Sequence, residues 1–117
     1  MVVEDEPDVR AITVDMARTL GHVVFEAANA DAALHLLSAL SINTLITDIG
    51  LPGMSGDVFA ALARSVRPQL GIVFATGNPR LRNLAADGTN TVVLCKPYGS
   101  AELADALATV SAANGAG

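Results

Sequence analysis

Five short apolar runs punctuate the chain, and longer stretches with apolar residues at helical spacing lie between them. The runs predict the strands Met1–Val3, Val23–Phe25, Leu45–Thr47, Ile72–Ala75 and Thr91–Cys95. The longer patterns predict helices over Pro7–Leu20, over Ala30–Leu40, from Val58 to near Pro68, and from a Ser100 cap to about Ala112. A short helix is also predicted over Arg80–Ala86. The chain therefore reads as strands and helices in alternation.

The residues between these segments support the same boundaries. Pro7 stands in the first turn of its helix, where a missing N–H costs nothing, and Gly21 ends that helix. Asn29 and Ser100 are side chains that commonly cap a helix N-terminus. The segment Gly50–Gly56 is dense in glycine and proline and is predicted to be a loop.

The alternation predicts an α/β fold, with one doubly wound parallel sheet of five strands covered by helices on both faces. At 117 residues the chain is long enough for one domain, spanning 1–117, with 113–117 as a frayed tail or the start of a linker. In such sheets ligands bind beyond the carboxyl ends of the strands. A functional site is therefore expected at that edge.

Polar side chains follow the predicted strands at that edge. Glu4 and Asp5 come after the first run, Asp48 after the third, and the hydroxyl of Thr76 after the fourth. Lys96, which is the only lysine in the chain, ends the fifth run and precedes a proline. Parallel strands bring these groups to one edge, so we interpret them as a single site. Taken singly, the lysine and the threonine would be ordinary strand-end residues.

Composition and charge narrow the possible partners. The chain carries 12 acidic and 7 basic residues, so direct binding of a nucleic-acid backbone is not expected. Its apolar runs are too short to cross a bilayer, and no membrane contact is expected of this domain. The one cysteine, Cys95, cannot form an internal disulfide and fits a reducing cytoplasm; it is expected to be buried.

The side chains at the predicted site suit phosphoryl chemistry with a hard metal ion. Carboxylates brought close together repel each other unless they bind a cation or a proton. A ligand set made of oxygen alone favours Mg²⁺ over zinc. If Asp48 attacked a phosphoryl donor, Lys96 and the metal would neutralise the developing charge, and the Thr76 hydroxyl could donate to one more oxygen.

Four motifs in order resemble the receiver domains of two-component response regulators. They are Val2–Pro7, Thr47–Gly56, Ala75–Gly77 and Lys96–Tyr98, and together they extend over nearly the whole chain. The resemblance implies a flavodoxin-like, CheY-like fold with strand order 2-1-3-4-5. It also implies a cis peptide between Lys96 and Pro97.

The resemblance further implies the role of each residue. Asp48 would accept a phosphoryl group from a phosphohistidine on a histidine kinase or a histidine phosphotransfer protein. Asp5, Asp48 and the carbonyl of Gly50 would ligate Mg²⁺, with Glu4 acting through water. Thr76 and Lys96 would contact the phosphoryl group, and the resulting change of conformation would control a downstream output protein or an attached domain.

The residues of these motifs are most similar to those of receivers in hybrid histidine kinases. The chain departs from many receivers at Val93, where they carry an aromatic residue. A degenerate receiver acting only as a docking module is the alternative, although it would be expected to lack Asp48 or Lys96. A phosphohydrolase of the haloacid-dehalogenase kind needs an aspartate at the position of Gly50. We therefore expect a signalling switch with self-catalysed phosphorylation and dephosphorylation rather than a metabolic enzyme.

Overall fold

The computed structural model describes residues 1–51, 53–78 and 90–115, with the backbone alone for 111–115. In chain order its elements are β1 (Val2–Val3), α1 (Pro7–Thr19), β2 (Glu26–Ala27), α2 (Ala30–Ala39), β3 (Thr44–Asp48), α3 (Gly56–Val66), β4 (Gly71–Thr76), β5 (Thr91–Cys95) and α4 (Ser100–Gly115). The short helix predicted over Arg80–Ala86 lies outside the described residues.

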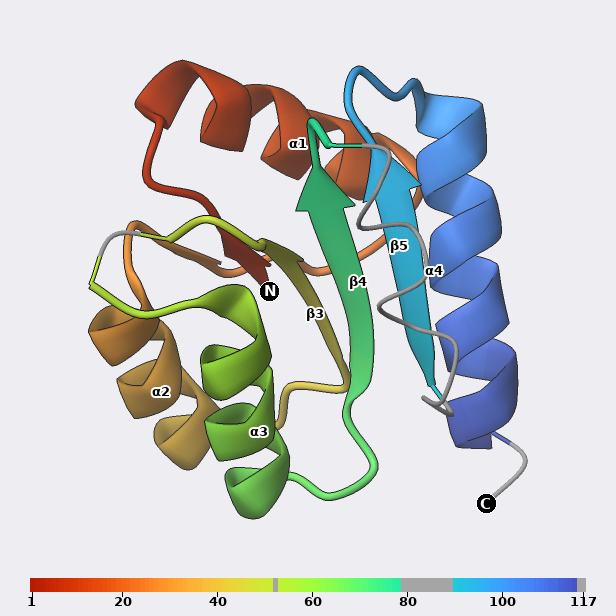
Figure 1. Ribbon diagram of the computed structural model, residues 1–117. Helices are drawn as coiled ribbons and strands as arrows, with labels where there is room; N and C mark the ends of the chain where they lie inside the picture. Colours follow the sequence, from red (N-terminus) through yellow and green to blue (C-terminus); the bar gives the residue numbers. More distant parts are fainter. Residues whose placement is uncertain (52, 79–89, 116–117) are drawn as a thin grey trace.

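The strands form one parallel sheet in the order β2-β1-β3-β4-β5, which confirms the predicted fold class and strand order. The central strands β3 and β4 pair along their whole lengths, from Thr44 opposite Gly71 to Asp48 opposite Ala75. The carboxyl ends of the strands lie at one edge of this sheet, as in other doubly wound folds (Figure 1).

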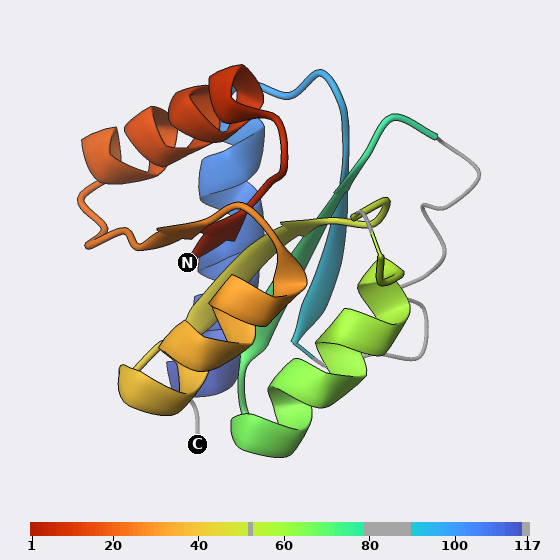
Figure 2. The same ribbon diagram turned by 90° about the vertical axis from the view of Figure 1, so that its left-hand side faces the viewer.

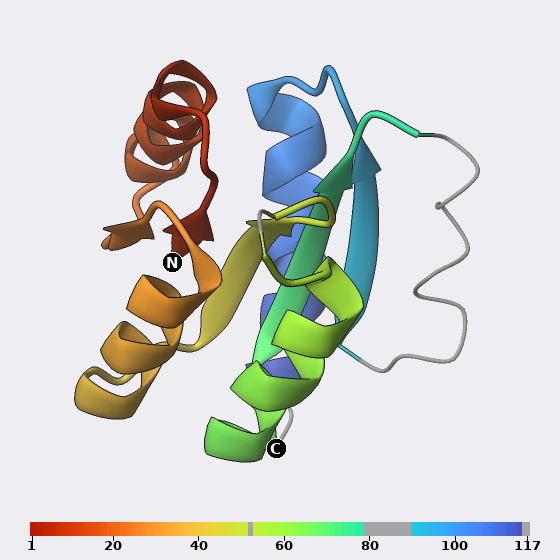
Figure 3. The same cartoon turned by 60° about the vertical axis from the view of Figure 1, so that its left-hand side comes forward.

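Two apolar layers hold the helices on opposite faces of the sheet. Because neighbouring residues of a strand point to opposite faces, Val3, Leu45 and Ile72 pack toward α2 and α3. Val2, Ile46 and Val73 pack toward the other face, which α1 and α4 cover. Figures 2 and 3 show the two pairs of helices on either side of the sheet, with α2 and α3 side by side. Strands buried on both faces explain their continuous apolar character.

One of the two predicted N-cap residues, Asn29, is confirmed, and so are the two residues that were predicted to bound α1. The Asn29 side chain accepts a hydrogen bond from Ala32 N–H (2.8 Å), and Pro7 opens α1. Gly21 follows α1 with φ +96°, a conformation that glycine adopts without steric cost. Ser100 is the first residue of α4 rather than its cap, and Gly99 N–H there donates to Glu102 Oε2 (2.8 Å). The helix continues to Gly115, three residues past the predicted end.

The second predicted strand was placed too early. β2 comprises Glu26–Ala27, whereas Val23 is 86% exposed and Phe25 is 38% exposed. Only the carbonyl of Phe25 joins the sheet, where it accepts from Val2 N–H (2.9 Å). The apolar run misled the assignment because this edge strand buries the small side chain of Ala27, which carries a weak hydropathy signal.

Cys95 is only partly buried, whereas the sequence predicted that it would be buried. Some apolar residues that were used to predict the helices are exposed. Ile12 on α1 and Val58 on α3 are 58% and 49% exposed, while alanines of both helices are buried. In the part of the chain that the structure describes, no helix combines the length and the apolarity that a bilayer crossing needs.

Candidate functional site

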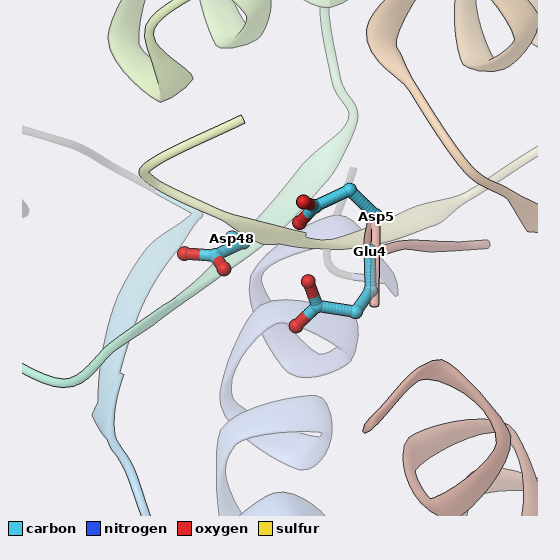
Figure 4. Close-up of side chains that lie close together, drawn as sticks. All are labelled: Glu4, Asp5 and Asp48. Atoms are coloured by element: carbon cyan, nitrogen blue, oxygen red, sulfur yellow. The ribbon is translucent and has the colours of Figure 1, made fainter. Parts of the chain in front are cut away.

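Three carboxyl groups gather at the carboxyl edge of the sheet. Glu4 and Asp5 follow β1, and Asp48 is the last residue of β3, the neighbouring strand. One carboxylate oxygen from each of the three lies within 4.8 Å of the other two. In Figure 4 the carboxylates of Glu4 and Asp5 both extend toward the side on which Asp48 lies. The sheet order thus brings together residues that are more than forty positions apart in the sequence.

Lys96 lies against two of these carboxylates. Its Nζ donates to Glu4 Oε1 (3.1 Å) and to Asp48 Oδ2 (3.1 Å). The Lys96 backbone N–H donates to the carbonyl of Thr76 (2.7 Å), which fixes the end of β5 beside the end of β4. The peptide between Lys96 and Pro97 is cis, as the resemblance implied.

Thr76 ends β4 and is buried, with 4% of its surface exposed. Its hydroxyl oxygen accepts a hydrogen bond from the backbone N–H of Asn78 (3.0 Å). The strand thus delivers Thr76 to the predicted edge, while the hydroxyl is engaged in a turn of its own loop. Val93, at the position where many receivers have an aromatic residue, packs with the core on the α2 and α3 face.

The loop after β3 is held to the end of that strand by hydrogen bonds from backbone N–H groups. Gly50 N–H donates to Asp48 Oδ1 (3.1 Å), and Gly56 N–H donates to the carbonyl of Ile49 (2.7 Å). A Cβ at position 56 would stand 2.7 Å from the Cα of Ile49, so the close approach of these two backbones requires glycine. The same construction at position 50 meets nothing within 4 Å.

The pKa values of Glu4 and Lys96 are both raised, for different reasons. Burial raises the pKa of Glu4, and the Lys96 ammonium opposes this by stabilising the charged carboxylate. Burial alone would lower the pKa of Lys96, but hydrogen bonds and charge attraction from Asp48 and Glu4 outweigh it, and the pKa of Lys96 is raised. Lys96 therefore stays an ammonium at neutral pH, and it balances part of the negative charge.

Sequence reasoning missed Arg10 as a support of this site. The Arg10 Nη1 donates to the carbonyl of Glu4 (2.8 Å), and its Nε donates to Glu26 Oε1 (3.1 Å). The guanidinium thus joins α1 to the turn that carries Glu4 and to β2. A basic residue one turn into a helix that follows acidic residues was the available signal, but contact with a carbonyl leaves no mark in a sequence.

The carboxylates fit a hard divalent cation. Octahedral Mg²⁺ keeps its oxygen ligands at about 2.0–2.1 Å and often uses one or two carboxylates together with water. The spread of the three carboxylate oxygens, 4.8 Å at most, is close to what such an ion spans. The residues present are therefore suitable for Mg²⁺, with small movements of the side chains and with Lys96 balancing the remaining charge.

A parallel sheet of this order, with acidic residues, a hydroxyl and a lysine at its carboxyl edge, defines a receiver-type signalling module. The family model of the response regulator receiver domain matches residues 1–108. The chain belongs to this family, and it is thus a receiver domain of two-component signal transduction.

Individual relatives agree with this assignment. The chain is 36% identical to the two-component response regulator PhoP of Pseudomonas aeruginosa over 110 residues, which cover 88% of the chain and 47% of PhoP. The crystal structure of the receiver domain from the hybrid histidine kinase CckA superposes with a TM-score of 0.78 at 28% identity, covering 93% of this chain and 94% of that one. A CheY-like receiver protein from Methanospirillum hungatei gives a TM-score of 0.86 at 23% identity over 99% and 95% of the two chains, and supports the fold.

The chain spans less than half the length of the first curated relatives it matches, from 23% to 47% of each. The similarity therefore concerns the receiver domain.

Proposed function

We propose that Asp48 is the phosphoacceptor of this receiver domain. Its carboxylate stands at the end of a central strand, with one oxygen bonded to Gly50 N–H and the other to Lys96 Nζ. The observation that carries the proposal is this pairing of the carboxylate with an ammonium, close to two further carboxylates. Both Asp48 and Lys96 are present, so the docking-module alternative is not needed.

In the proposed reaction a carboxylate oxygen of Asp48 attacks the phosphorus of a phosphohistidine. A bond forms between that oxygen and phosphorus, while the bond from phosphorus to the histidine nitrogen breaks. Lys96 would move from its carboxylate partners to an oxygen of the transferred group, where its positive charge is most useful. Thr76 would release its contact with Asn78 and donate a hydrogen bond from its hydroxyl to another phosphoryl oxygen.

Mg²⁺ is the proposed cofactor. Asp5 and Asp48 would hold it directly with the carbonyl of Gly50, and Glu4 would act through a bound water. The close grouping of the three carboxylates supports this assignment. A bound Mg²⁺ supplies positive charge that offsets the charge on the phosphoryl oxygens.

The proposed partners follow from the chemistry of the site. A histidine kinase or a histidine phosphotransfer protein would supply the phosphoryl group, and an output protein or an attached domain would receive the signal.

We propose a cytoplasmic location, which the single cysteine supports. We also propose that the domain is a switch with self-catalysed phosphorylation and dephosphorylation rather than a metabolic enzyme. The similarity to the CckA receiver leaves a place in a hybrid histidine kinase as part of this proposal.

Intact-mass measurement after incubation with acetyl phosphate tests the acceptor directly. With Mg²⁺ the protein is expected to gain one phosphoryl group, and with EDTA it is expected to gain none. The Asp48→Asn variant is expected to stay unmodified, because an amide oxygen is too weak a nucleophile for this displacement. Asp57→Asn is the matched control, since Asp57 is an exposed carboxylate in the first turn of α3. Modification of the Asp48→Asn protein to the wild-type extent would refute the assignment.

A further inference from the structure

The segment between Lys96 and α4 has few backbone contacts that could hold the lysine in place. Lys96 N–H is bonded to Thr76, but the next residue, Pro97, has no N–H to donate. Gly99 N–H is used by Glu102 at the start of α4. The position of the lysine backbone therefore depends strongly on Tyr98, which lies between these two points.

The Tyr98 side chain reaches across to α1. Its phenol oxygen lies 3.0 Å from Thr13 Oγ1, and either group can be the donor. Thr13 is a buried hydroxyl, with 4% of its surface exposed, in the middle of α1. The Tyr98 ring packs with the apolar layer on the α1 and α4 face of the sheet. The contact joins residues 85 positions apart.

A second connection joins the same two parts of the chain at the site itself. Lys96 Nζ is bonded to Glu4, which immediately precedes the turn into α1. In the proposed reaction the ammonium leaves this carboxylate to meet the phosphoryl group. In the described structure, the hydrogen bond between Tyr98 and Thr13 would then still join the lysine segment to α1, and it does not involve a charged group.

We propose that Tyr98 and Thr13 are positioning residues for Lys96. Their hydrogen bond fixes the backbone on the carboxyl side of the lysine, as the bond to Thr76 fixes it on the amino side, so that the ammonium reaches the phosphoryl oxygen with little loss of freedom. This inference rests on the proposed function. The hydroxyl groups carry the effect, and the ring and methyl groups supply packing.

Variants that remove one hydroxyl each test this assignment. Tyr98→Phe and Thr13→Val keep most of the side-chain volume, while Thr13→Ser keeps the hydroxyl. With acetyl phosphate, the maximal phosphorylation rate is expected to fall about fivefold in Tyr98→Phe and Thr13→Val, a factor that matches the net contribution of one hydrogen bond. The Mg²⁺ concentration for half-maximal rate is expected to stay the same, because the carboxylates do not move.

The combined variant and a matched control separate positioning from general stability. The double variant is expected to be no slower than either single variant, because both lose the same bond. Thr13→Ser is expected to retain the wild-type rate. Thr109→Val removes a hydroxyl that bonds only within α4, to the carbonyl of Asp105 (2.8 Å), and is expected to leave the rate unchanged. Additive losses in the double variant, or an equal loss in Thr109→Val, would overturn the proposal.

Amide hydrogen exchange at Lys96, followed by NMR without any phosphodonor, gives a second readout. Exchange is expected to be faster in Tyr98→Phe and Thr13→Val than in the wild type, while core amides of β3 keep their protection. Unchanged exchange at Lys96 would overturn the positioning role whatever the phosphorylation result. If the wild-type protein took up no phosphoryl group while the exchange changed as expected, the proposed function would fail and the structural part of the inference would stand.

Discussion

At the scale of single residues, two glycines that flank the same loop differ in the space that surrounds their Cα atoms. Gly56 is buried, and a Cβ added at this position would lie only 2.7 Å from the Cα of Ile49. Gly50 has open space around it, although it lies beside Asp48 in the sequence. Both residues belong to the motif that the sequence identified, yet only one of them is required by packing.

Alanine substitutions at these two positions are expected to differ in stability. Gly56→Ala forces the backbone of the loop apart and is expected to lower the free energy of unfolding by about 2 kcal/mol. Gly50→Ala is expected to change it by less than about 0.5 kcal/mol, as for other unpacked surface positions. Urea denaturation followed by circular dichroism measures both. Equal losses in the two variants would contradict the difference in packing described above.

At the scale of elements, local side-chain chemistry sets where helices begin more clearly than hydropathy sets where strands lie. Asn29 caps α2 as its sequence position suggested, because capping depends on neighbours two or three residues away. The boundaries of β2 could not be read in the same way. Val23 and Phe25 form an apolar run, but the sheet pairs Val2 with Glu26 and Val3 with Ala27. Register of an edge strand depends on its partner strand, which is distant in sequence.

Replacement of the cap of α2 has a defined expected cost. Asn29→Ala removes the acceptor of the Ala32 N–H and is expected to lower the free energy of unfolding by about 1 kcal/mol. Asn29→Asp keeps an acceptor at the positive end of the helix and is expected to stay within about 0.5 kcal/mol of the wild type. Thermal and urea unfolding of the two variants measure these changes in the free energy of unfolding. A full loss in Asn29→Asp would show that the amide group itself is needed.

At the scale of the whole molecule, Lys96 joins three strands that are far apart in the chain. It is bonded through its side chain to Glu4 after β1 and to Asp48 of β3, and through its backbone to Thr76 of β4. The Glu4 side chain is only 6% exposed, so the loss of its cationic partner would leave a buried carboxylate with a single long hydrogen bond in the described structure, from Glu6 N–H (3.4 Å). The site is therefore also part of what holds the sheet edge together.

Removal of this ammonium is expected to have a metal-dependent cost. In EDTA, Lys96→Met is expected to lower the free energy of unfolding by about 2 kcal/mol, because the carboxylates lose a charged hydrogen-bond partner. Added Mg²⁺ is expected to recover more stability in Lys96→Met than in the wild type, because the cation no longer competes with the ammonium. Thermal unfolding with and without Mg²⁺ measures this difference.

The matched control for that experiment is Arg18→Met. It also removes one positive charge, from the last turn of α1, where the guanidinium contacts only an exposed carbonyl in the described structure. It is expected to change stability little and to respond to Mg²⁺ as the wild type does. A larger gain from Mg²⁺ in Arg18→Met than in Lys96→Met would contradict the role given to the site ammonium.

The succession of strands and helices could be predicted from the order of residues alone, and so could the polar residues at the ends of β1, β3, β4 and β5. Glu4, Asp5, Asp48, Thr76 and Lys96 could be named because each follows an apolar run, and because parallel strands bring their carboxyl ends to one edge. These predictions depend on the local periodicity of apolar residues, which is visible in the sequence. They also depend on the general rule that crossovers between parallel strands are right-handed.

The contacts between these groups, and the residues that support them, became visible in the folded structure alone. The bonds from Lys96 to Glu4, from Arg10 to the Glu4 carbonyl, and from Tyr98 to Thr13 join segments brought together by the sheet and the helix packing. The hydroxyl and carbonyl groups that form these bonds follow no periodic pattern in the sequence. The length and angle of each hydrogen bond depend on how α1 and the end of β5 pack against the same core. That arrangement is a property of the folded chain as a whole, so it could not be predicted from residue order.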